Sequence, residues 1–188
     1  MELRPLKEKD VDGMLEWMHD VDINRLFATD FGSFSREKVL AFIQSASDES
    51  NDVHRACVDD NDEYLGTVSL KNIDADAHKA EYAVSFRKCA HGSGAARFAT
   101  LGILDYGFRE LGLKRIYLNV LSDNARANRF YQKMGFIFEG TFTKHLFVDG
   151  ALRDLNWYRM LSEDFFRCLN RDLFSTYELC DETSKQLL

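Results

Sequence analysis

A pair of glycines inside a basic stretch of the sequence is the feature best suited to chemistry on a phosphorylated ligand. The stretch Tyr82–Leu104 has no acidic residue and carries Arg87, Lys88 and Arg97 around the loop Cys89–Gly94, which reads C-A-H-G-S-G. We expect a strand before this loop and a helix after it. In that arrangement unpaired backbone N–H groups and the positive end of the helix dipole converge on an anion. Taken alone, the glycines could equally serve the geometry of a turn.

A second basic stretch, Asn124–Phe138, carries Arg126, Arg129 and Lys133 and again no acid. The whole chain has 24 Lys and Arg residues against 31 Asp and Glu residues. Setting aside the six basic residues of the two stretches leaves 18 against 31, a net charge of −13. A local reversal of sign beside a glycine pair favours a phosphorylated ligand. The overall charge of −7 argues against a nucleic-acid partner and is compatible with a cationic amine as substrate.

Two nucleotide-binding motifs are not met at the loop. A Walker loop requires Lys-Ser or Lys-Thr after its second glycine, whereas Ala95 and Ala96 follow here. A dinucleotide-binding fingerprint requires a third glycine three residues after the second, and Arg97 occupies that position.

The bulk properties favour a single soluble domain. The chain has 188 residues, of which 45% are hydrophobic, enough to bury a full core. It contains no apolar run that could span a membrane, and Met1–Arg4 lacks the hydrophobic region of a signal peptide, so we expect a cytoplasmic protein without a membrane partner. The cysteines Cys57, Cys89, Cys168 and Cys180 form no C-x-x-C pair, which argues against a disulfide framework or a metal site. We expect a monomer or a homodimer.

Hydrophobic periodicity and turn residues predict an α/β domain on a mixed sheet. The predicted strands are Leu3–Leu6, Val53–Val58, Glu63–Leu70, Ala80–Phe86, Lys114–Leu121, Phe136–Phe147 and Ala151–Met160. The predicted helices are Lys7–His19, Arg36–Ser45 with Ser35 as its cap, Gly92–Leu111, Asn124–Met134 and one that follows Ser162. Asp149 and Gly150 are expected to form the turn of the last hairpin.

Side-chain patterns indicate which faces of these elements are buried. In the strand Ala80–Phe86, one face carries Tyr82, Val84 and Phe86 and is assigned to the core, and the other is small and polar, with Glu81, Ala83 and Ser85. The long helix is expected to bury Phe98, Leu101, Leu104, Phe108 and Leu111. The last helix carries Phe165, Phe166, Leu169, Leu173 and Tyr177 on one side.

The glycine loop, the strand after it and the pattern Asn124-x-x-x-Asn128-x-x-Tyr131-x-x-x-Gly135-Phe136 resemble the GNAT superfamily of acetyl-CoA-dependent N-acetyltransferases. Within it, the chain looks like the branch with the RimJ/RimL-like ribosomal-protein enzymes and the spermidine acetyltransferases. The resemblance covers residues 1–161. It implies an α+β fold with a mixed, mostly antiparallel central sheet, flanked by helices and splayed at the cofactor-binding strands. Residues 162–188 would form an extra C-terminal helical extension, packed on the same domain or on a partner subunit.

The resemblance also implies acetyl-CoA as co-substrate and assigns its contacts. The backbone of Val84–Phe86 would pair with the pantetheine arm, and the N–H groups of His91–Ala96 would hold the pyrophosphate. Arg129 or Lys133 would lie near the adenosine phosphates. The full set of implied cofactor residues is Val84, Ser85, Phe86, Cys89, His91, Gly92, Ser93, Gly94, Ala95, Ala96, Asn119, Asn124, Asn128, Phe130, Tyr131 and Lys133.

Two residues are implied as catalytic. Tyr131 would protonate the departing thiolate, and Glu81 would take a proton from the attacking amine through a water. Tyr131 could instead be a core tyrosine, since its helical face is apolar, and Glu81 could be a surface carboxylate. The family commonly has Gln or Arg where Cys89 stands, so one side-chain contact to phosphate is lost. Arg87 or Lys88 could compensate for it.

The expected reaction is acetyl transfer to a primary amine of a small molecule or a protein N-terminus, by direct attack in a ternary complex. Polyamines and amino-sugar nucleotides remain open as substrates. The helices after the first strand and the hairpin Phe136–Met160 are expected to select the amine. The acids Asp20, Asp22, Asp30 and Asp154 could line its site or be solvated loop charges. An acyl-CoA-binding protein without turnover, and a structural or dimeric partner protein, remain as alternatives.

Overall fold

The computed structural model describes residues 1–27, 29–49, 51–148 and 150–170. Within them a single sheet of seven strands runs in the order β1-β2-β3-β4-β5-β7-β6. The strands are β1 (Glu2–Arg4), β2 (Val53–Val58), β3 (Tyr64–Asp74), β4 (Lys79–Phe86), β5 (Arg115–Leu121), β6 (Ile137–Val148) and β7 (Ala151–Leu161). Neighbouring strands are antiparallel except β4 and β5, which are parallel. The mixed, mostly antiparallel sheet predicted from the sequence is confirmed.

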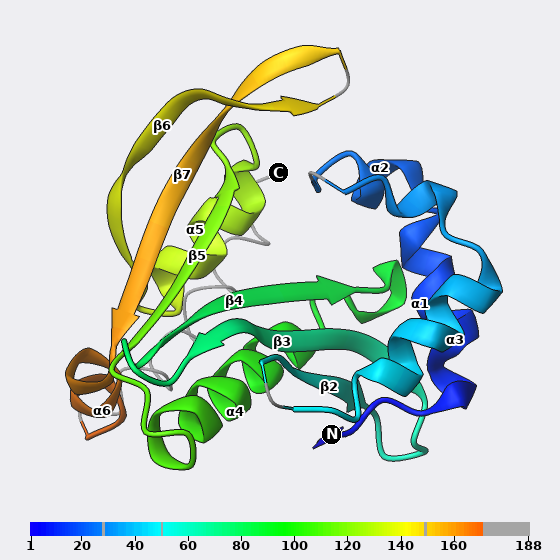
Figure 1. The fold of residues 1–188 in the computed structure, drawn as a ribbon, viewed down its shortest axis with the longest axis horizontal. Helices are drawn as coiled ribbons and strands as arrows, with labels where there is room; N and C mark the ends of the chain where they lie inside the picture. The colour runs from blue at the N-terminus through cyan, green and yellow to red at the C-terminus, as the bar shows by residue number, and fades with distance from the viewer. Residues whose placement is uncertain (28, 50, 149, 171–188) are drawn as a thin grey trace, which may run out of the picture.

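Helices cover both faces of the sheet (Figure 1). They are α1 (Val11–Met18), α2 (Val21–Asn24), α3 (Arg36–Ser45), α4 (Ala95–Arg109), α5 (Ala125–Lys133) and α6 (Ser162–Asn170). Short 3-10 turns occur at η1 (Glu8–Asp10), η2 (Phe31–Ser33) and η3 (Lys88–Ala90). Side chains of α1, α2 and α3 form one apolar cluster with β2 and β3, and α4 and α5 share a second cluster with the central strands.

The first predicted helix is shorter than expected. The carboxylate of Asp10, 1% exposed, accepts bonds from the guanidinium of Arg4 at 2.7 Å and from the backbone N–H of Lys7 at 2.8 Å. These bonds fix a 3-10 turn before α1 begins at Val11. The sequence prediction also missed α2, a single turn whose N-cap, Asp20, accepts from two backbone N–H groups.

The helix α4 begins three residues later than predicted, because Gly92 and Gly94 both have positive φ angles and lie outside it. Its buried face agrees with the prediction at Leu104 and Phe108 but not at Phe98. Phe98 is 39% exposed, whereas small residues such as Ala95 and Ala99 are fully buried. A Cβ on Gly107 would lie 2.9 Å from Leu70, so the helix packs closely on the sheet.

Several other elements match their predictions. Helix α3 and strand β2 have the predicted bounds, and Ser35 Oγ caps α3 by accepting from the N–H of Lys38. The last hairpin forms as β6 and β7, although its turn residue Asp149 lies outside the described residues. None of the described helices is long and apolar enough to cross a membrane.

The start of the C-terminal extension packs on the domain. Phe165 of α6 is 1% exposed and contacts Phe108 of α4, with ring centroids 5.3 Å apart. The predicted contributions of Leu173 and Tyr177 lie outside the described residues. The division of the chain into 1–161 and 162–188 stays a prediction.

Candidate active site

The two central strands separate part of the way along their length. Strands β4 and β5 pair only from Lys79–Glu81 to Arg115–Tyr117. Beyond that point β4 remains bonded to β3 as far as Phe86, and β5 follows β7 as far as Leu121 (Figure 1). On the side of β4 that faces β5, the backbone beyond Glu81 therefore has no strand partner among the described residues. Such an edge can bind an extended ligand as an added strand, as the sequence predicted for Val84, Ser85 and Phe86.

The glycine loop lies between the end of β4 and the start of α4. Gly92 and Gly94 have φ angles of +81° and +84°, and a Cβ on either would meet nothing within 4 Å. The N–H of Ala95 donates to Ser93 Oγ at 3.2 Å, but those of Gly92, Gly94 and Ala96 donate to no described residue. Because these free donors and the positive end of α4 lie together, the loop fits a pyrophosphate group.

Arg87 and Lys88 do not face this loop as free cations. Arg87 forms ion pairs with Glu16 at 2.5 Å and Glu63 at 2.6 Å, and Lys88 pairs with Asp20 at 2.7 Å. Both pKa values are raised by these carboxylates. Neither side chain is therefore free to replace the phosphate contact that Cys89, an exposed thiol, lacks.

Arg126 is a candidate cofactor residue that the sequence prediction did not include. Its guanidinium lies 3.1 Å from Nδ1 of His91, which joins the first turn of α5 to the glycine loop. Burial and the nearby Arg126 lower the pKa of His91, so its ring favours the neutral form. The only signal in the sequence was the basic character of the stretch 124–138. That signal does not tell which of its basic side chains lies near the glycine loop.

The end of α5 fixes the position of Tyr131. Gly135, with φ +81°, allows the N–H of Phe136 to bond to the carbonyl of Tyr131 at 2.9 Å, a Schellman ending. The ring of Phe136 then packs on that of Tyr131, with centroids 5.9 Å apart. Tyr131 also contacts Tyr82 of β4 at 6.1 Å. The Gly-Phe pair thus holds Tyr131 against β4, where the strands separate.

Tyr131 is 8% exposed, and its hydroxyl makes no hydrogen bond to a described residue. Burial raises its pKa well above the ordinary value, so the phenol stays protonated at neutral pH. A protonated hydroxyl without an internal partner can donate to a departing thiolate. Beside it, Phe130 is half-buried and packs on the same core, and Lys133 is exposed.

The two asparagines of the sequence motif support α5. Asn124 caps the helix, with its Oδ1 accepting from the N–H of Ala127. Asn128 is 9% exposed, donates to the carbonyls of Leu121 and Asn124, and accepts from Asn156 and Tyr158. Since both ends of the Asn128 amide are occupied, its side chain has no free atom for the predicted cofactor contact.

Glu81 lies at the last position of β4 that pairs with β5, on the face opposite α4. Its carboxylate accepts from Asn72 at 3.0 Å, is 3.4 Å from the ammonium of Lys71 and 3.5 Å from the amide of Asn119. The carboxylate is partly exposed, with 21% of the side chain accessible. A carboxylate where two strands part can reach a ligand lying between them.

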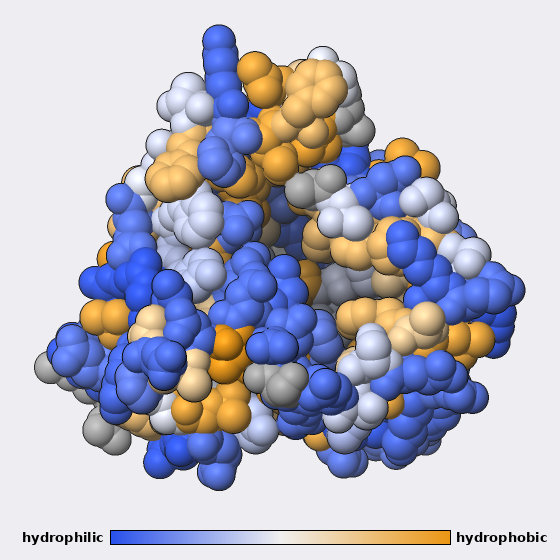
Figure 2. Space-filling view, in the orientation of Figure 1, coloured by the Kyte–Doolittle hydropathy of each residue, from blue (hydrophilic) through white to orange (hydrophobic). Residues whose placement is uncertain are grey.

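The four acids that were candidates for an amine site all have partners within the structure. Asp20 and Asp22 pair with Lys88, Asp154 accepts from the N–H of Lys144, and Asp30 accepts from Asn24. They do not form one free acidic lining. Figure 2 shows the surface hollowed between the β6–β7 hairpin and α2.

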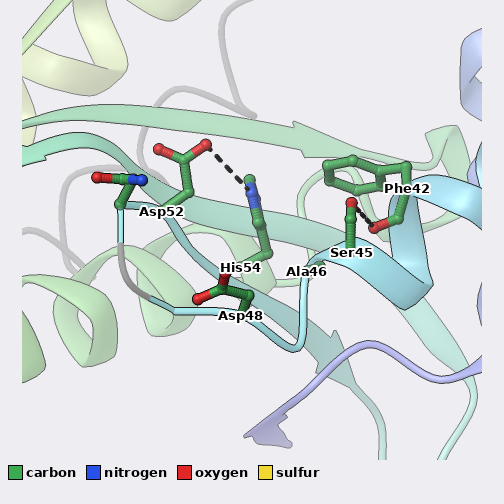
Figure 3. Close-up of a pocket in the computed structure, with 7 residues that line it drawn as sticks. Phe42, Ser45, Ala46, Asp48, Asp52 and His54 are labelled. Carbon is green, nitrogen blue, oxygen red and sulfur yellow. Dashed lines mark hydrogen bonds and ion pairs between the residues drawn. The ribbon is translucent and has the colours of Figure 1, made fainter.

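A separate pocket of about 260 Å³ lies where α3 ends and β2 begins (Figure 3). It is lined in part by Phe42, Asp48, Asp52 and His54, and Nε2 of His54 lies 3.8 Å from the carboxylate of Asp52. Burial lowers the pKa of His54. None of the lining residues belongs to the glycine loop or to the fork, the place where β4 and β5 separate, so we do not assign this pocket to the reaction. Among the described residues no cluster of His, Cys, Asp and Glu could hold a metal ion.

Comparisons with known proteins agree with this geometry. The family model described as "Acetyltransferase (GNAT) domain" matches residues 1–137. Spermidine N(1)-acetyltransferase of Escherichia coli (strain K12) is 30% identical over 159 residues, 82% of each chain. The putative ribosomal N-acetyltransferase YdaF of Bacillus subtilis (strain 168) is 30% identical over 100 residues, 53% of this chain and 55% of that protein.

The fold matches a solved structure closely. Spermidine N-acetyltransferase from Vibrio cholerae, in complex with CoA and spermine, superposes with a TM-score of 0.81 at 23% sequence identity. The match covers 88% of this chain and 97% of that one.

Proposed function

Since the chain belongs to the GNAT acetyltransferase family and is an acetyl-CoA-dependent N-acetyltransferase, we propose that it transfers the acetyl group directly to a primary amine at the fork between β4 and β5. The observation that carries this proposal is that two candidate binding features, a strand edge and an anion-binding loop, adjoin each other. The unpaired edge of β4 leads straight into the glycine loop with its free N–H groups.

The residues present fit acetyl-CoA, which supplies the activated acetyl thioester when bound. The N–H groups of Gly92, Gly94 and Ala96 would hold the pyrophosphate, and Arg126 would add a positive charge beside it. The backbone of Val84–Phe86 would pair with the pantetheine arm. No covalent intermediate with a protein side chain is required.

Proton transfer would be divided between the two faces of the sheet. On the face opposite α4, Glu81 would accept the proton of the attacking amine through a water. On the other face, Tyr131 would give a proton to the departing sulfur, since its raised pKa keeps it protonated.

For the amine there are two candidates, and one is a polyamine. Two observations support it: the similarity to spermidine N(1)-acetyltransferase of E. coli and the net charge of −7, which attracts cations. The amino terminus of a protein, as expected for the RimJ/RimL-like branch, is the second candidate. It is favoured by an unpaired indole N–H on the Glu81 face, which a polyamine has no oxygen to accept.

Release of free thiol from acetyl-CoA, measured with a panel of amines, tests the proposal. We expect release only when a primary amine is present, with the acetyl group recovered on that amine by mass spectrometry. Tight CoA binding without thiol release for any amine would instead support a binding protein without turnover. Absence of CoA binding at millimolar concentration would contradict the assignment of the loop.

A further inference from the structure

Among the described residues, one buried polar side-chain atom has no hydrogen-bond partner, the indole nitrogen Nε1 of Trp157. By contrast, Trp17 donates its indole N–H to the hydroxyl of Tyr64 at 3.2 Å. Buried donors in folded proteins nearly always find an acceptor, because an unpaired one loses its bonds to water without replacement. Trp157 therefore carries a donor for which the described fold provides no acceptor.

The position of Trp157 relates this donor to the reaction. On the sheet, Trp157 of β7 is directly paired with Asn119 of β5, and the Asn119 amide lies 3.5 Å from the carboxylate of Glu81. Paired residues point to the same face of a sheet, so the indole lies on the Glu81 face. Its ring stacks on Tyr117, with centroids 6.0 Å apart and planes at 24°. Tyr117 in turn is paired with Glu81 across β4 and β5.

Because the indole Nε1 is buried, a ligand reaches it only if a neighbouring side chain moves, and Phe142 is an exposed side chain packed on the Trp157 ring. This residue of β6 packs on Trp157 at 5.2 Å and is 49% exposed. The pairing of β6 with β7 shifts register between Phe142 and Leu146, so the hairpin is not held there by a regular ladder. Movement of this exposed side chain would not break the sheet.

The chemistry of the donor restricts the ligand. An indole N–H can only donate, so its partner must carry a lone pair. A polyamine at neutral pH carries ammonium groups, which are also only donors. An amine that bears a hydroxyl or carbonyl oxygen can bind both protein groups, with its nitrogen toward the carboxylate of Glu81 and its oxygen accepting from the indole N–H of Trp157. The faces of Tyr117 and Trp157 suit the positive charge of such an amine before it loses its proton.

We propose that Trp157 is a specificity residue that selects primary amines with an oxygen acceptor, such as amino alcohols or peptide amino termini, over amines without one. The inference rests on the proposed function, because it places the amine on the Glu81 face of the fork. It adds the substrate class, which the fork and the glycine loop do not determine.

Matched pairs of substrates test this inference. Amino alcohols of increasing chain length are each compared with the alkylamine that has a methyl group in place of the hydroxyl, and a dipeptide amide is compared with spermidine. We expect the oxygen-bearing member to have the higher kcat/KM in at least one pair. The variant Trp157→Phe keeps the stacked ring and removes the N–H. It should lower kcat/KM about tenfold for the oxygen-bearing amine alone, and so abolish the preference.

The possible results separate the two proposals. Equal rates within every pair, or an equal loss for both members in Trp157→Phe, would overturn the role of Trp157 while acetyl transfer stands. No thiol release with any amine would overturn the proposed function itself.

A binding measurement gives a readout that does not depend on turnover or on the folding of the variant. In the wild-type complex with CoA, which has no acetyl group to transfer, the two indole N–H resonances are followed by NMR, with Trp17→Phe used to assign them. The Trp157 proton should move downfield with the oxygen-bearing amine and stay in place with its methyl counterpart. Identical shifts with both amines would contradict the proposed bond.

Discussion

The guanidinium of Arg126 lies 3.1 Å from Nδ1 of His91, so the first turn of α5 contacts the glycine loop directly. Because His91 favours the neutral form, this contact does not consume the positive charge of Arg126. A phosphate at the loop would therefore meet both the free backbone N–H groups and an arginine held in position beside them.

Replacing Arg126 by Gln should weaken acetyl-CoA binding about three- to thirtyfold, the usual value of a charge-assisted bond to phosphate at a partly exposed site. Calorimetric titration measures the affinity, and its loss on adding salt should be smaller in the variant. The matched control is Arg109→Gln at the far end of α4, where the arginine pairs with Asp105. An equal effect of both variants would show that only the overall charge matters.

Replacing Gly94 by Ala should cost stability and cofactor binding together. At φ +84° a Cβ strains the backbone, which destabilises the fold by about 1–2 kcal/mol, and the methyl group would also occupy the space open to phosphate. Gly112 provides the matched control, since its φ is +65° and a Cβ there also meets nothing within 4 Å. Both variants should lose similar stability in urea unfolding, but only Gly94→Ala should weaken acetyl-CoA binding, by about tenfold or more. Equal acetyl-CoA affinities in the two variants would refute the loop as the phosphate site.

Replacing Tyr131 by Phe should lower kcat by about 10²-fold, the range of general acid catalysis, and leave acetyl-CoA affinity nearly unchanged. The ring contacts with Tyr82 and Phe136 are retained, and no hydrogen bond to a described residue is lost. Because burial raises the pKa of Tyr131, its ionisation should not limit kcat at neutral or mildly alkaline pH. Equal losses of turnover and affinity would assign Tyr131 to cofactor binding instead.

The buried His54 should make stability depend on pH. Burial lowers its pKa in the folded state, only partly offset by Asp52. Below pH 6.5, about the ordinary pKa of histidine, His54 becomes protonated in the unfolded chain but stays neutral in the folded chain. The free energy of unfolding should therefore fall as the pH drops from there toward the folded-state pKa. Urea unfolding at about pH 7.5 and pH 5.5 measures this change. The variant His54→Gln, which can keep the bond to Ser69, should lose less stability over the same interval. An identical pH dependence in both proteins would rule out His54 as its source.

Much of the fold could be predicted because local signals and packing agree. Alternation along Ala80–Phe86 predicted its core face, and Tyr82 and Phe86 are indeed buried. The long helix showed the limit of such patterns, since Phe98 points outward. The sheet approaches α4 so closely that small residues, not large ones, form the contact.

The site was predicted less completely, because side-chain partners come from elements distant in sequence. The sequence suggested that Arg87 and Lys88 are unpaired cations near the loop. Their acidic partners lie on α1, at the cap of α2 and just before β3. Asn128 read as a cofactor ligand, yet its amide is bonded to β5, β7 and its own helix cap. The roles of Glu81, Tyr131 and the cofactor residues remain predictions that the variants above can test.

The ion pair of Lys88 with Asp20 has a mechanical consequence. The carboxylate of Asp20 caps α2 and also binds Lys88, which lies in the turn that leads into the glycine loop. A displacement of α2 or of this turn would therefore be transmitted to the other. Binding of a phosphate group at the loop would thereby affect the helix that borders the hollow, and each substrate would change the affinity for the other by the same factor.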